Sequence, residues 1–340
     1  MTVLAIGAYT LDLYMFGDHL PATGESVEAF EYATAHGGKA ANVAVASARL
    51  GAPTRFVGCL GDDADGPAAL AALRADGVEV GDCATAGGTA TGRSFVYVDG
   101  EGRQIVMTWP GAANLLPASR AAATAARLPP GSVLVLQGEI PVETSAAAAA
   151  AAPPGVRLML NPSPAGPFLG RDGEELLGRA DVLVLNEVEL SALAGDGRDT
   201  GTGRDGAGRD GRGTGGGRAG AAREAAGDVR PVEALRARTR GRAVIVTRGE
   251  NGAEMIDDHG TMLIGVPHVD AVDTTGAGDA FTGALAAALR GGASLAQGAR
   301  IACRVAAVSV TRRFCAPSYP SASELGIAPF HGPPGQERPT

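Results

Sequence analysis

The sequence predicts an α/β protein, in which a mostly parallel sheet carries helices on both faces and a small second sheet lies beside it. Short, continuously apolar runs alternate along the chain with segments of helical length, and such runs are typical of parallel strands buried on both faces. Two other segments alternate apolar and polar residues, as half-buried strands do. The length of 340 residues is enough for one large domain with a small accessory.

The main sheet is expected to begin with the apolar run "TVLAIG" at residues 2–7, which ends at a glycine. Further strands are predicted at residues 55–58, 132–136, 156–160, 181–185 and 243–247. Helices are predicted at residues 40–50, 67–76, 118–127, 142–152, 187–194, 232–240, 278–290 and 295–312. In parallel sheets of this kind, a ligand site lies beyond the carboxyl ends of the strands.

The small second sheet is predicted from residues 28–36 and 91–109, where a turn, "DGEG", separates the segments 95–98 and 104–108. The chain is accordingly divided into an α/β domain (residues 1–11, 36–87 and 112–328) and the second sheet (residues 12–35 and 88–111). Residues 195–228 are predicted to be a flexible insertion, since 13 of these 34 residues are glycine, mixed with Arg, Asp and Thr. The Pro- and Gly-rich residues 329–340 are predicted to be a frayed tail.

The composition excludes several classes of function. A net charge of −8 argues against broad contacts with DNA or RNA, which need clustered Lys and Arg. No apolar window reaches the length of a membrane span, and the N-terminus has no basic n-region. The four cysteines form no C-x-x-C pair and the five histidines no i,i+4 pair, so no zinc or disulfide framework is predicted. We therefore expect a cytoplasmic protein in a reducing setting, without nucleic-acid or membrane partners.

The stretch "DTTGAGD" at residues 273–279 directly precedes an apolar helix. Small residues let the unpaired backbone amides of a helix N-terminus approach an anion closely. Asp279 then has two interpretations: it caps the helix, or it accepts a proton from a hydroxyl beside a bound phosphate, as phosphoryl transfer requires. The chain contains neither a P-loop motif nor a G-x-G-x-x-G that opens a helix after the first strand.

A second glycine-rich turn, "HGGK" at residues 36–39, opens another apolar helix. Lys39 is the only lysine of the chain, and it lies three residues before Asn42 on the same helix face. Both side chains can donate hydrogen bonds to hydroxyl groups, and bare glycine backbone lets a polyol come close. Asp12, just past the first predicted strand, is either a strand-end turn residue or an acceptor for two vicinal hydroxyls.

Together these motifs resemble the ribokinase-like (PfkB) carbohydrate kinase family, and among its members most of all the ribokinases. The two signature stretches are "GGKAANVAVASARLG" at residues 37–51 and "DTTGAGDAFTGAL" at residues 273–285. Shorter motifs agree in order and spacing: "GDDADG", "LQGEIP", "LNPSPA", "NEVE", "VTRGENGA" and "VTRRFCAPS". The resemblance covers about residues 2 to 325 apart from the glycine-rich insertion. It implies a three-layer fold whose central sheet has helices on both faces and a small β-sheet lid.

The resemblance implies that the γ-phosphate of ATP is transferred to a primary hydroxyl of a sugar, with ribose or a related furanose as the expected acceptor. Asp279 is implied to be the catalytic base, and the backbone amides of Gly276, Ala277 and Gly278 to stabilise charge on the transferred phosphate. The residues implied to bind the sugar are Asp12, Gly38, Lys39, Asn42 and Glu139.

The resemblance also implies two cofactor sites, for ATP with Mg²⁺ and for a monovalent cation such as K⁺. Asn186 and Glu189 are expected near the Mg²⁺ and the phosphates. The residues expected to contact the nucleotide are Thr247, Gly249, Gly252 and Cys303. The positions that match the cation site of the family are Asp273, Thr275, Ser309, Arg312, Phe314 and Ser318. Phe314-Cys315 depart from the family, which usually has Gly-Ala there.

In this family a β lid closes over the sugar and excludes water, and two lids often pair, so a homodimer is expected. Other acceptors stay open: those of a nucleoside (adenosine-type) kinase, a fructokinase or a ketodeoxygluconate kinase. Four aromatic residues either stack on a base or only pack the lid, namely Tyr9, Tyr14, Phe16 and Trp109. A non-catalytic sugar-binding regulatory protein on the same fold is the alternative of another class, because fold alone does not secure activity.

Overall fold

The structure is a computed structural model that describes residues 1–195, 229–239 and 242–330. The insertion predicted at residues 195–228 lies outside the described residues except for Gly195, and so do residues 331–340 of the predicted tail. No helix within the described ranges has both the length and the apolar character needed to cross a membrane.

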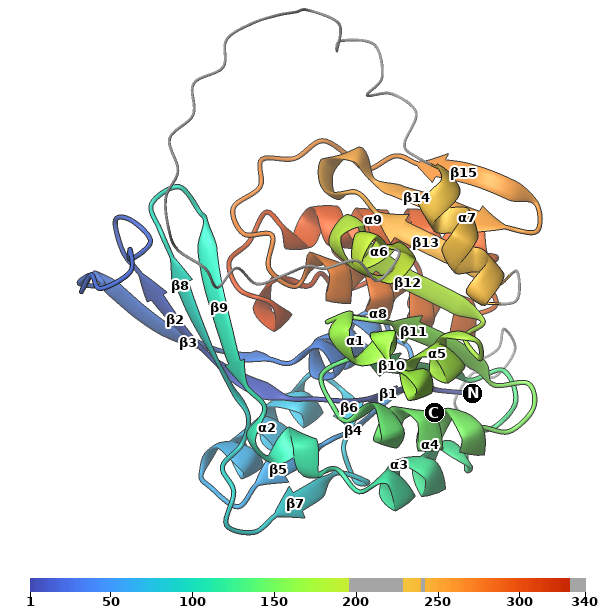
Figure 1. The fold of residues 1–340 in the computed structure, drawn as a ribbon, viewed down its shortest axis with the longest axis horizontal. Coiled ribbons are helices and arrows are strands. Elements are labelled where there is room, and N and C mark those ends of the chain that lie inside the picture. The colour runs from blue at the N-terminus through green and yellow to red at the C-terminus, as the bar shows by residue number, and fades with distance from the viewer. Residues whose placement is uncertain (196–228, 240–241, 331–340) are drawn as a thin grey trace, which may run out of the picture.

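Within the described residues, a nine-stranded sheet forms the centre of the molecule, in the order β15-β14-β13-β12-β11-β10-β1-β4-β6 (Figure 1). Its strands are β1 (Val3–Ile6), β4 (Thr54–Val57), β6 (Val78–Glu79), β10 (Val133–Gln137), β11 (Arg157–Asn161), β12 (Val182–Asn186), β13 (Ala243–Thr247), β14 (Ala253–Asp257) and β15 (Gly260–Ile264). Neighbouring strands from β13 to β6 are parallel to one another, whereas β14 is antiparallel to both of its neighbours, β13 and β15. The carboxyl ends of the parallel strands therefore meet at one edge.

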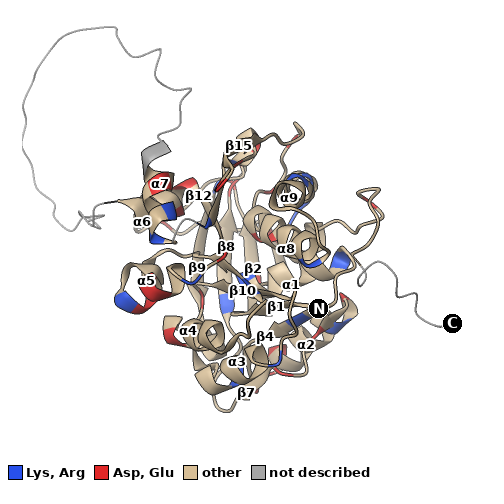
Figure 2. Cartoon of the chain, turned by 90° about the vertical axis from the view of Figure 1, so that its right-hand side faces the viewer, with Lys and Arg blue, Asp and Glu red and all other residues tan. Residues whose placement is uncertain are grey.

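Helices cover both faces of this sheet (Figure 2). One face carries α1 (Lys39–Arg49), α2 (Asp65–Ala75), α8 (Ala277–Arg290) and α9 (Leu295–Ser309). The other carries α3 (Ala118–Ala125), α4 (Val142–Ala151), α5 (Arg171–Leu177), α6 (Glu187–Ala194) and α7 (Val229–Arg238). Alternate residues of β1 enter opposite cores, Val3 and Ala5 on the first face and Leu4 and Ile6 on the second. The predicted α/β class with helices on both faces is thus confirmed.

A second sheet of four described strands stands at the side of the molecule and is called the lid sheet here (Figure 1). Its order is β3 (Glu31–Gly37), β2 (Thr10–Phe16), β8 (Arg93–Val98) and β9 (Gln104–Trp109). A short pair, β5 (Cys59–Gly61) and β7 (Ala84–Ala86), lies apart from it. The turn predicted at residues 99–102 does join β8 and β9 as a hairpin.

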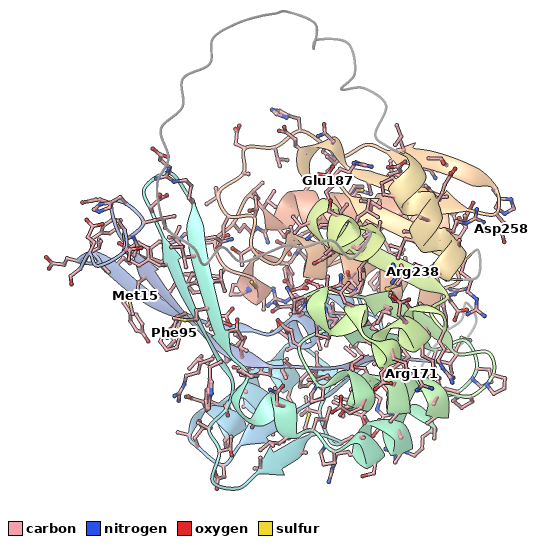
Figure 3. The ribbon with its side chains drawn as sticks, in the orientation of Figure 1. Met15, Phe95, Arg171, Glu187, Arg238 and Asp258 are labelled. Carbon is pink, nitrogen blue, oxygen red and sulfur yellow. The ribbon has the colours of Figure 1, made fainter. Side chains whose placement is uncertain are left out.

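The register of the lid sheet gives it two chemically different faces. Asp12 pairs with Ser94 and Tyr14 with Val96, and these side chains form the inner face, which adjoins the site described below. Leu13 pairs with Phe95 on the opposite, outer face. Figure 3 shows the side chains of Met15 and Phe95 together on this outer face.

The structure corrects the expected elements at several points. Asp12 is not a strand-end turn residue, because it lies inside β2, a strand that was not predicted from the sequence. The hairpin β14–β15 and the helix α5 were also missed. Helix α9 ends at Ser309 instead of residue 312, and α8 begins one residue earlier than expected.

Candidate active site

A cavity of about 600 Å³ opens where the carboxyl edge of the central sheet meets the inner face of the lid sheet. We call it the acceptor cavity. Of the predicted residues, those in its wall are Asp12, Gly38, Lys39, Asn42, Glu139, Thr275, Gly276 and Asp279. Ala277 and Gly278 follow Gly276 in the first turn of α8 but do not line the cavity. Segments from β2 to α8 thus meet around one space.

Two adjacent glycines allow β2 to pass close to the start of α1. A Cβ on Gly37 would lie 2.1 Å from Oδ2 of Asp12, so a larger residue there would displace the carboxylate. Gly38 has a φ of 88°, and a Cβ on it would lie 2.6 Å from the carbonyl oxygen of Ala8. The "HGGK" turn therefore places Asp12 beside the first turn of α1.

Hydrogen bonds tie the first turn of α1 to two other parts of the cavity wall. The backbone N–H of Lys39 donates to Oε2 of Glu139, which follows β10, at 2.7 Å. One turn of the helix later, Nδ2 of Asn42 donates to Oδ2 of Asp279 at 2.9 Å. Both contacts hold carboxylates at a helix N-terminus, where unpaired amides and the helix dipole favour negative charge.

The start of α8 combines a tight turn with unpaired amides. Gly276, the N-cap residue, has a φ of 76°, and a Cβ on it would lie 2.6 Å from the hydroxyl of Tyr319. That hydroxyl donates to the carbonyl of Gly276 at 3.1 Å and so fixes the turn. Within the described part of the chain, the amides of Gly276, Gly278 and Asp279 have no acceptor, whereas Ala277 donates to Thr274 at 3.3 Å. This arrangement is suited to bind an anion.

The electrostatics of the cavity depend on one lysine among several carboxylates. Burial raises the pKa of Asp12 to about 6, against the hydrogen bonds from Thr10 and Ser94. Burial raises the pKa of Glu139 to about 7, and it also raises the pKa of Asp279, although Lys39 opposes both shifts. Burial works against the charged form of Lys39, yet the carboxylates around it outweigh burial and raise its pKa. Lys39 is thus the counter-ion of the cavity.

The structure adds polar residues that the analysis of the sequence missed. Thr10 Oγ1 donates to Oδ1 of Asp12 at 2.7 Å. The hydroxyls of Ser94 and Thr108 lie 3.1 Å apart on neighbouring strands, and all three hydroxyl residues line the cavity. The period-two alternation of strands was the available signal, since it places Thr10 and Asp12 on one face once β2 is recognised.

The residues expected around the nucleotide lie at the same edge of the sheet but outside the acceptor cavity. Asn186 ends β12 beside Thr247, which ends β13. Asn186 also caps α6: its side chain accepts from the N–H of Glu189 at 2.9 Å, and its own N–H donates to Oε2 of Glu189 at 2.8 Å. Gly249 and Gly252 follow β13 with φ values of 54° and 83°. Cys303 instead lies in the core between α9 and the sheet, with 3% of its surface exposed.

Glu189 and Asn186 fit a magnesium ion held through water. The carboxylate of Glu189 is buried and close enough to Asp279 to raise the pKa of that group. No cluster of three or more His, Cys, Asp or Glu residues in the described ranges could hold a metal ion by itself. Mg²⁺ usually keeps several waters and binds through one or two carboxylates plus substrate phosphates, which matches this sparse set.

The residues expected around a monovalent cation lie on two adjacent loops. Val310 accepts the N–H groups of Val272 and Asp273 at 2.7 and 3.1 Å, which joins the loops. The carboxylate of Asp273 accepts the N–H of Thr275 at 2.9 Å and that of Phe314 at 2.8 Å. The remaining expected residues, Ser309, Arg312 and Ser318, lie on the segment that carries Phe314, where Arg312 donates to the carbonyl of Ser318 at 3.4 Å.

Comparison with known proteins places this chain among sugar kinases. The family model for the pfkB family carbohydrate kinases matches residues 2–322. The ribokinase of Schizosaccharomyces pombe is 30% identical over 96% of this chain and 96% of its own length. The ribokinase structure from Thermotoga maritima has a TM-score of 0.79 at 28% identity, covering 96% of this chain and 98% of its own. That of Arabidopsis thaliana ribokinase, complexed with ribose and ATP, has a TM-score of 0.74 at 27% identity, covering 95% and 97%.

The match extends over nearly the whole chain, and the residues at the shared motifs meet around one cavity. The fold is that of ribokinase, and the enzyme class is a phosphotransferase with an alcohol group as acceptor. We conclude that the chain belongs to the pfkB family of carbohydrate kinases.

Proposed function

We propose that the protein is an ATP-dependent kinase that phosphorylates a primary hydroxyl of ribose or a related furanose. The observation that carries this proposal is the acceptor cavity itself, which holds Asp279 at the start of α8 and Asp12 on the lid sheet. A sugar bound to Asp12 would face a carboxylate and unpaired amides together. A kinase that consumes ATP and a free sugar is expected to work in the cytoplasm.

Asp279 is proposed to be the catalytic base. Burial raises the pKa of this carboxyl, which makes its ionised form a stronger base for a sugar hydroxyl. The unpaired amides of Gly276 and Gly278 would stabilise charge on the transferred phosphoryl group. Ala277, whose amide makes a long bond of 3.3 Å to Thr274, is proposed to join them when phosphate is bound.

The remaining wall residues are proposed to bind the sugar hydroxyls. Asp12 and Glu139 are acceptors when ionised, whereas Lys39 and Asn42 are donors on one face of α1. Gly38 leaves its backbone open to the sugar. The hydroxyls of Thr10 and Ser94 hydrogen-bond to Asp12 and would hold its carboxylate in place for the acceptor.

ATP is proposed to bind along the ends of β12 and β13, with Thr247, Gly249 and Gly252 beside the nucleotide. Asn186 and Glu189 would hold Mg²⁺ through water, and this ion would neutralise phosphate charge. Cys303 is buried in the core, so we propose that it supports the nucleotide site by packing under it.

We also propose a K⁺ site between the loops of Asp273 and Phe314. The positive φ of Phe314 keeps the backbone shape that a glycine would adopt at this position, so its carbonyl stays available. Thr275, Ser309, Arg312 and Ser318 complete the proposed set. The expected result is a higher rate when K⁺ replaces Na⁺ in the assay.

A nucleoside is the second candidate acceptor, because the cavity continues beyond the proposed sugar site. Its wall also includes Pro110, Pro141, Pro164 and Asn114, and the exposed side chain of Asn114 makes no hydrogen bond within the described residues. Such an apolar extension with one free amide would suit a base. Fructose and ketodeoxygluconate remain acceptors to be tested in the same assay.

The test is ADP release from ATP and Mg²⁺ with a panel of pentoses, hexoses, ketodeoxygluconate and nucleosides. Ribose is expected to give the highest kcat/KM. Asp279→Asn should lower kcat by about 10²- to 10⁴-fold, the usual contribution of a general base, while sugar binding persists. If a sugar binds and yet no acceptor stimulates ADP release, the protein is a non-catalytic sugar-binding protein and the proposal is wrong.

The lid sheet is proposed to close over the acceptor and to pair with a second copy of the chain through its outer face. Exclusion of water from the closed cavity would prevent hydrolysis of ATP. The outer face is suited to a partner because it exposes a row of large apolar side chains, Met15, Tyr32, Phe95, Ile105, Met107 and Trp109.

A further inference from the structure

The loop that follows α9 has an unusual backbone at Phe314. Its φ of 69° makes it the one residue other than glycine with a positive φ in the described part of the chain. This conformation is crowded for any residue with a Cβ, and glycine adopts it most easily. A phenylalanine at such a position therefore needs compensating contacts.

The ring of Phe314 packs against the inner face of the lid sheet. It meets the ring of Tyr14 edge to face, with centroids 4.9 Å apart and an interplanar angle of 73°. The small apolar cluster that it joins is otherwise made of lid-sheet residues, namely Tyr14, Phe16, Ala33, Ala35, Val96 and Val98. Phe314 thus adds an aromatic ring from outside the lid to the core of the lid, beside the contact of 3.9 Å between the Tyr14 hydroxyl and Sγ of Cys315.

The neighbouring Arg313 also contacts the lid sheet, through Phe16 and Glu31. Its guanidinium lies 4.1 Å from the ring centroid of Phe16, and it pairs with Glu31 of β3 at 3.0 Å. Both partners of this ion pair are about two-fifths exposed, 41% and 44%, so the pair itself contributes little. The buried ring of Tyr14 against Phe314 is the stronger link.

The backbone of the same residue reaches the loop of residues 273–278, which we call the anion-binding loop. Phe314 N–H donates to Asp273 Oδ2 at 2.8 Å, and Oδ1 of the same carboxylate accepts Thr275 N–H at 2.9 Å. On the other side, Thr275 Oγ1 donates to Gln104 of β9 at 3.0 Å. A continuous set of contacts thus runs from the lid sheet through Phe314 to the anion-binding loop.

We propose that Phe314 is a positioning residue that couples the lid sheet to the anion-binding loop. Its ring packs against the lid sheet, and its N–H donates a hydrogen bond to the carboxylate of Asp273. That carboxylate in turn accepts the N–H of Thr275 and so fixes the loop. The loop keeps its geometry while the lid lies on the ring, so phosphoryl transfer is favoured when the lid covers the acceptor. The part of this inference that concerns transfer rests on the proposed function.

Two substitutions distinguish the effect of the Phe314 ring from the effect of its backbone conformation. Phe314→Ala removes the ring and keeps the crowded backbone, whereas Phe314→Gly removes both. Phe30→Ala is the matched control, because Phe30 is a lid aromatic that is 67% exposed and has no ring contact within the described residues. For each variant we would measure hydrogen exchange of the full-length protein, its Tm, the KM for ribose, and ADP release with and without ribose.

Both Phe314 variants are expected to exchange faster in β8 and in the anion-binding loop, while Phe30→Ala resembles the wild type. The KM for ribose should rise about three- to tenfold, the scale of an edge-to-face ring pair, and the share of ADP released without ribose should rise as well. Phe314→Gly should lose this coupling even if its Tm equals or exceeds that of Phe314→Ala.

The inference would be overturned if hydrogen exchange in β8 and in the anion-binding loop were unchanged in both variants. It would also be overturned if Phe314→Gly kept the wild-type KM for ribose and the wild-type share of ADP released without ribose. Phe314 would then only pack in the core of the lid. The exchange measurement needs no turnover. It therefore still decides the coupling if the wild type transfers phosphate to no acceptor, a result that would refute the proposed function alone.

Discussion

Lys39 is the residue on which the charge balance of the acceptor cavity depends. Asp12, Glu139 and Asp279 all lie in the wall with it, and the pKa of each carboxyl is raised by burial. A lysine ammonium is a compact point charge, so it can balance several carboxylates at once, which a planar guanidinium does less well. The presence of one lysine in a chain rich in arginine is therefore consistent with a requirement of the site.

The raised pKa values predict how kcat/KM for the acceptor depends on pH. Asp12 and Glu139 are stronger acceptors of hydroxyl hydrogen bonds when they are ionised, and their pKa values are raised to about 6 and about 7. The kcat/KM should therefore increase from about pH 5 to about pH 8, since this ratio follows the ionisation of the free enzyme. The measurement is a pH profile with ribose, or with the best acceptor found.

Glu139→Gln is the matched variant for this profile, because it keeps the size and one acceptor oxygen of the side chain. The higher step of the profile should disappear and a step near the pKa of Asp12, about 6, should remain. The charge of Asp12 raises the pKa of Glu139 and both carboxylates interact with Lys39, so the steps belong to the group rather than to single residues. A wild-type profile that is flat over this range would contradict the assignment.

At the scale of elements, strand β9 is the edge strand of the lid sheet, and its two faces border different surroundings. All six of its residues are exposed, although Val106 and Thr108 face the acceptor cavity and Ile105, Met107 and Trp109 face outward. An exposed edge strand with large apolar side chains is a surface that proteins normally cover. The apolar outer face of the lid sheet in a second copy of the chain could cover this surface.

We therefore predict a dimer that depends on this outer face. Wild-type protein should sediment at twice the chain mass of 33.9 kDa, and Met107→Asp should sediment as a monomer because a charge replaces a side chain that is 68% exposed in one copy. Leu263→Asp is the control, since Leu263 is 77% exposed on β15, away from the lid sheet. Monomeric wild-type protein, or equal masses for both variants, would refute the interface.

The elements themselves show why some of the fold was predictable from the sequence. Strands such as β10 and β12 are continuous apolar runs bounded by polar residues, so their positions follow from the pattern alone. The β2 segment "TLDLYMF" contains a buried aspartate, and a buried charged residue breaks the apolar pattern that would identify a strand. The hairpin β14–β15 is half exposed and carries no strong turn signal, so it was missed.

At the scale of the whole molecule, the candidate site was more predictable than the sheet edges. Asp279, Lys39 and Asn42 belong to glycine-rich motifs whose meaning does not depend on the rest of the fold. Ser94 belongs to no such motif, because it reaches Asp12 only when strands β2 and β8 pair. Thr10 contacts Asp12 within β2, a strand that the apolar pattern did not reveal. Tertiary pairing between distant segments is the information that a local pattern lacks.

The cluster of buried carboxylates also predicts how the stability of the whole protein depends on pH. A carboxyl whose pKa is higher in the folded than in the unfolded state stabilises the fold in its protonated form. The pKa of Asp12 is raised from 3.8 to about 6, and that of Glu139 from 4.5 to about 7. The stabilisation is therefore complete below the unfolded pKa of each group and is lost as the pH rises through its folded pKa. The pKa of Lys39 is raised from 10.5, and its contribution stays constant over this range.

We predict that Asp12→Asn/Glu139→Gln removes this loss. Without ligands, the free energy of unfolding of the wild type should fall relative to that of the variant between about pH 4.5 and about pH 7.5, by about 3 kcal/mol for each group. Urea unfolding of both proteins across this range measures the difference, in which the titration of surface carboxylates cancels. Parallel stability curves would show that the two carboxyls titrate in the folded protein as they do in the unfolded chain, and the charge balance assigned to Lys39 would then be wrong.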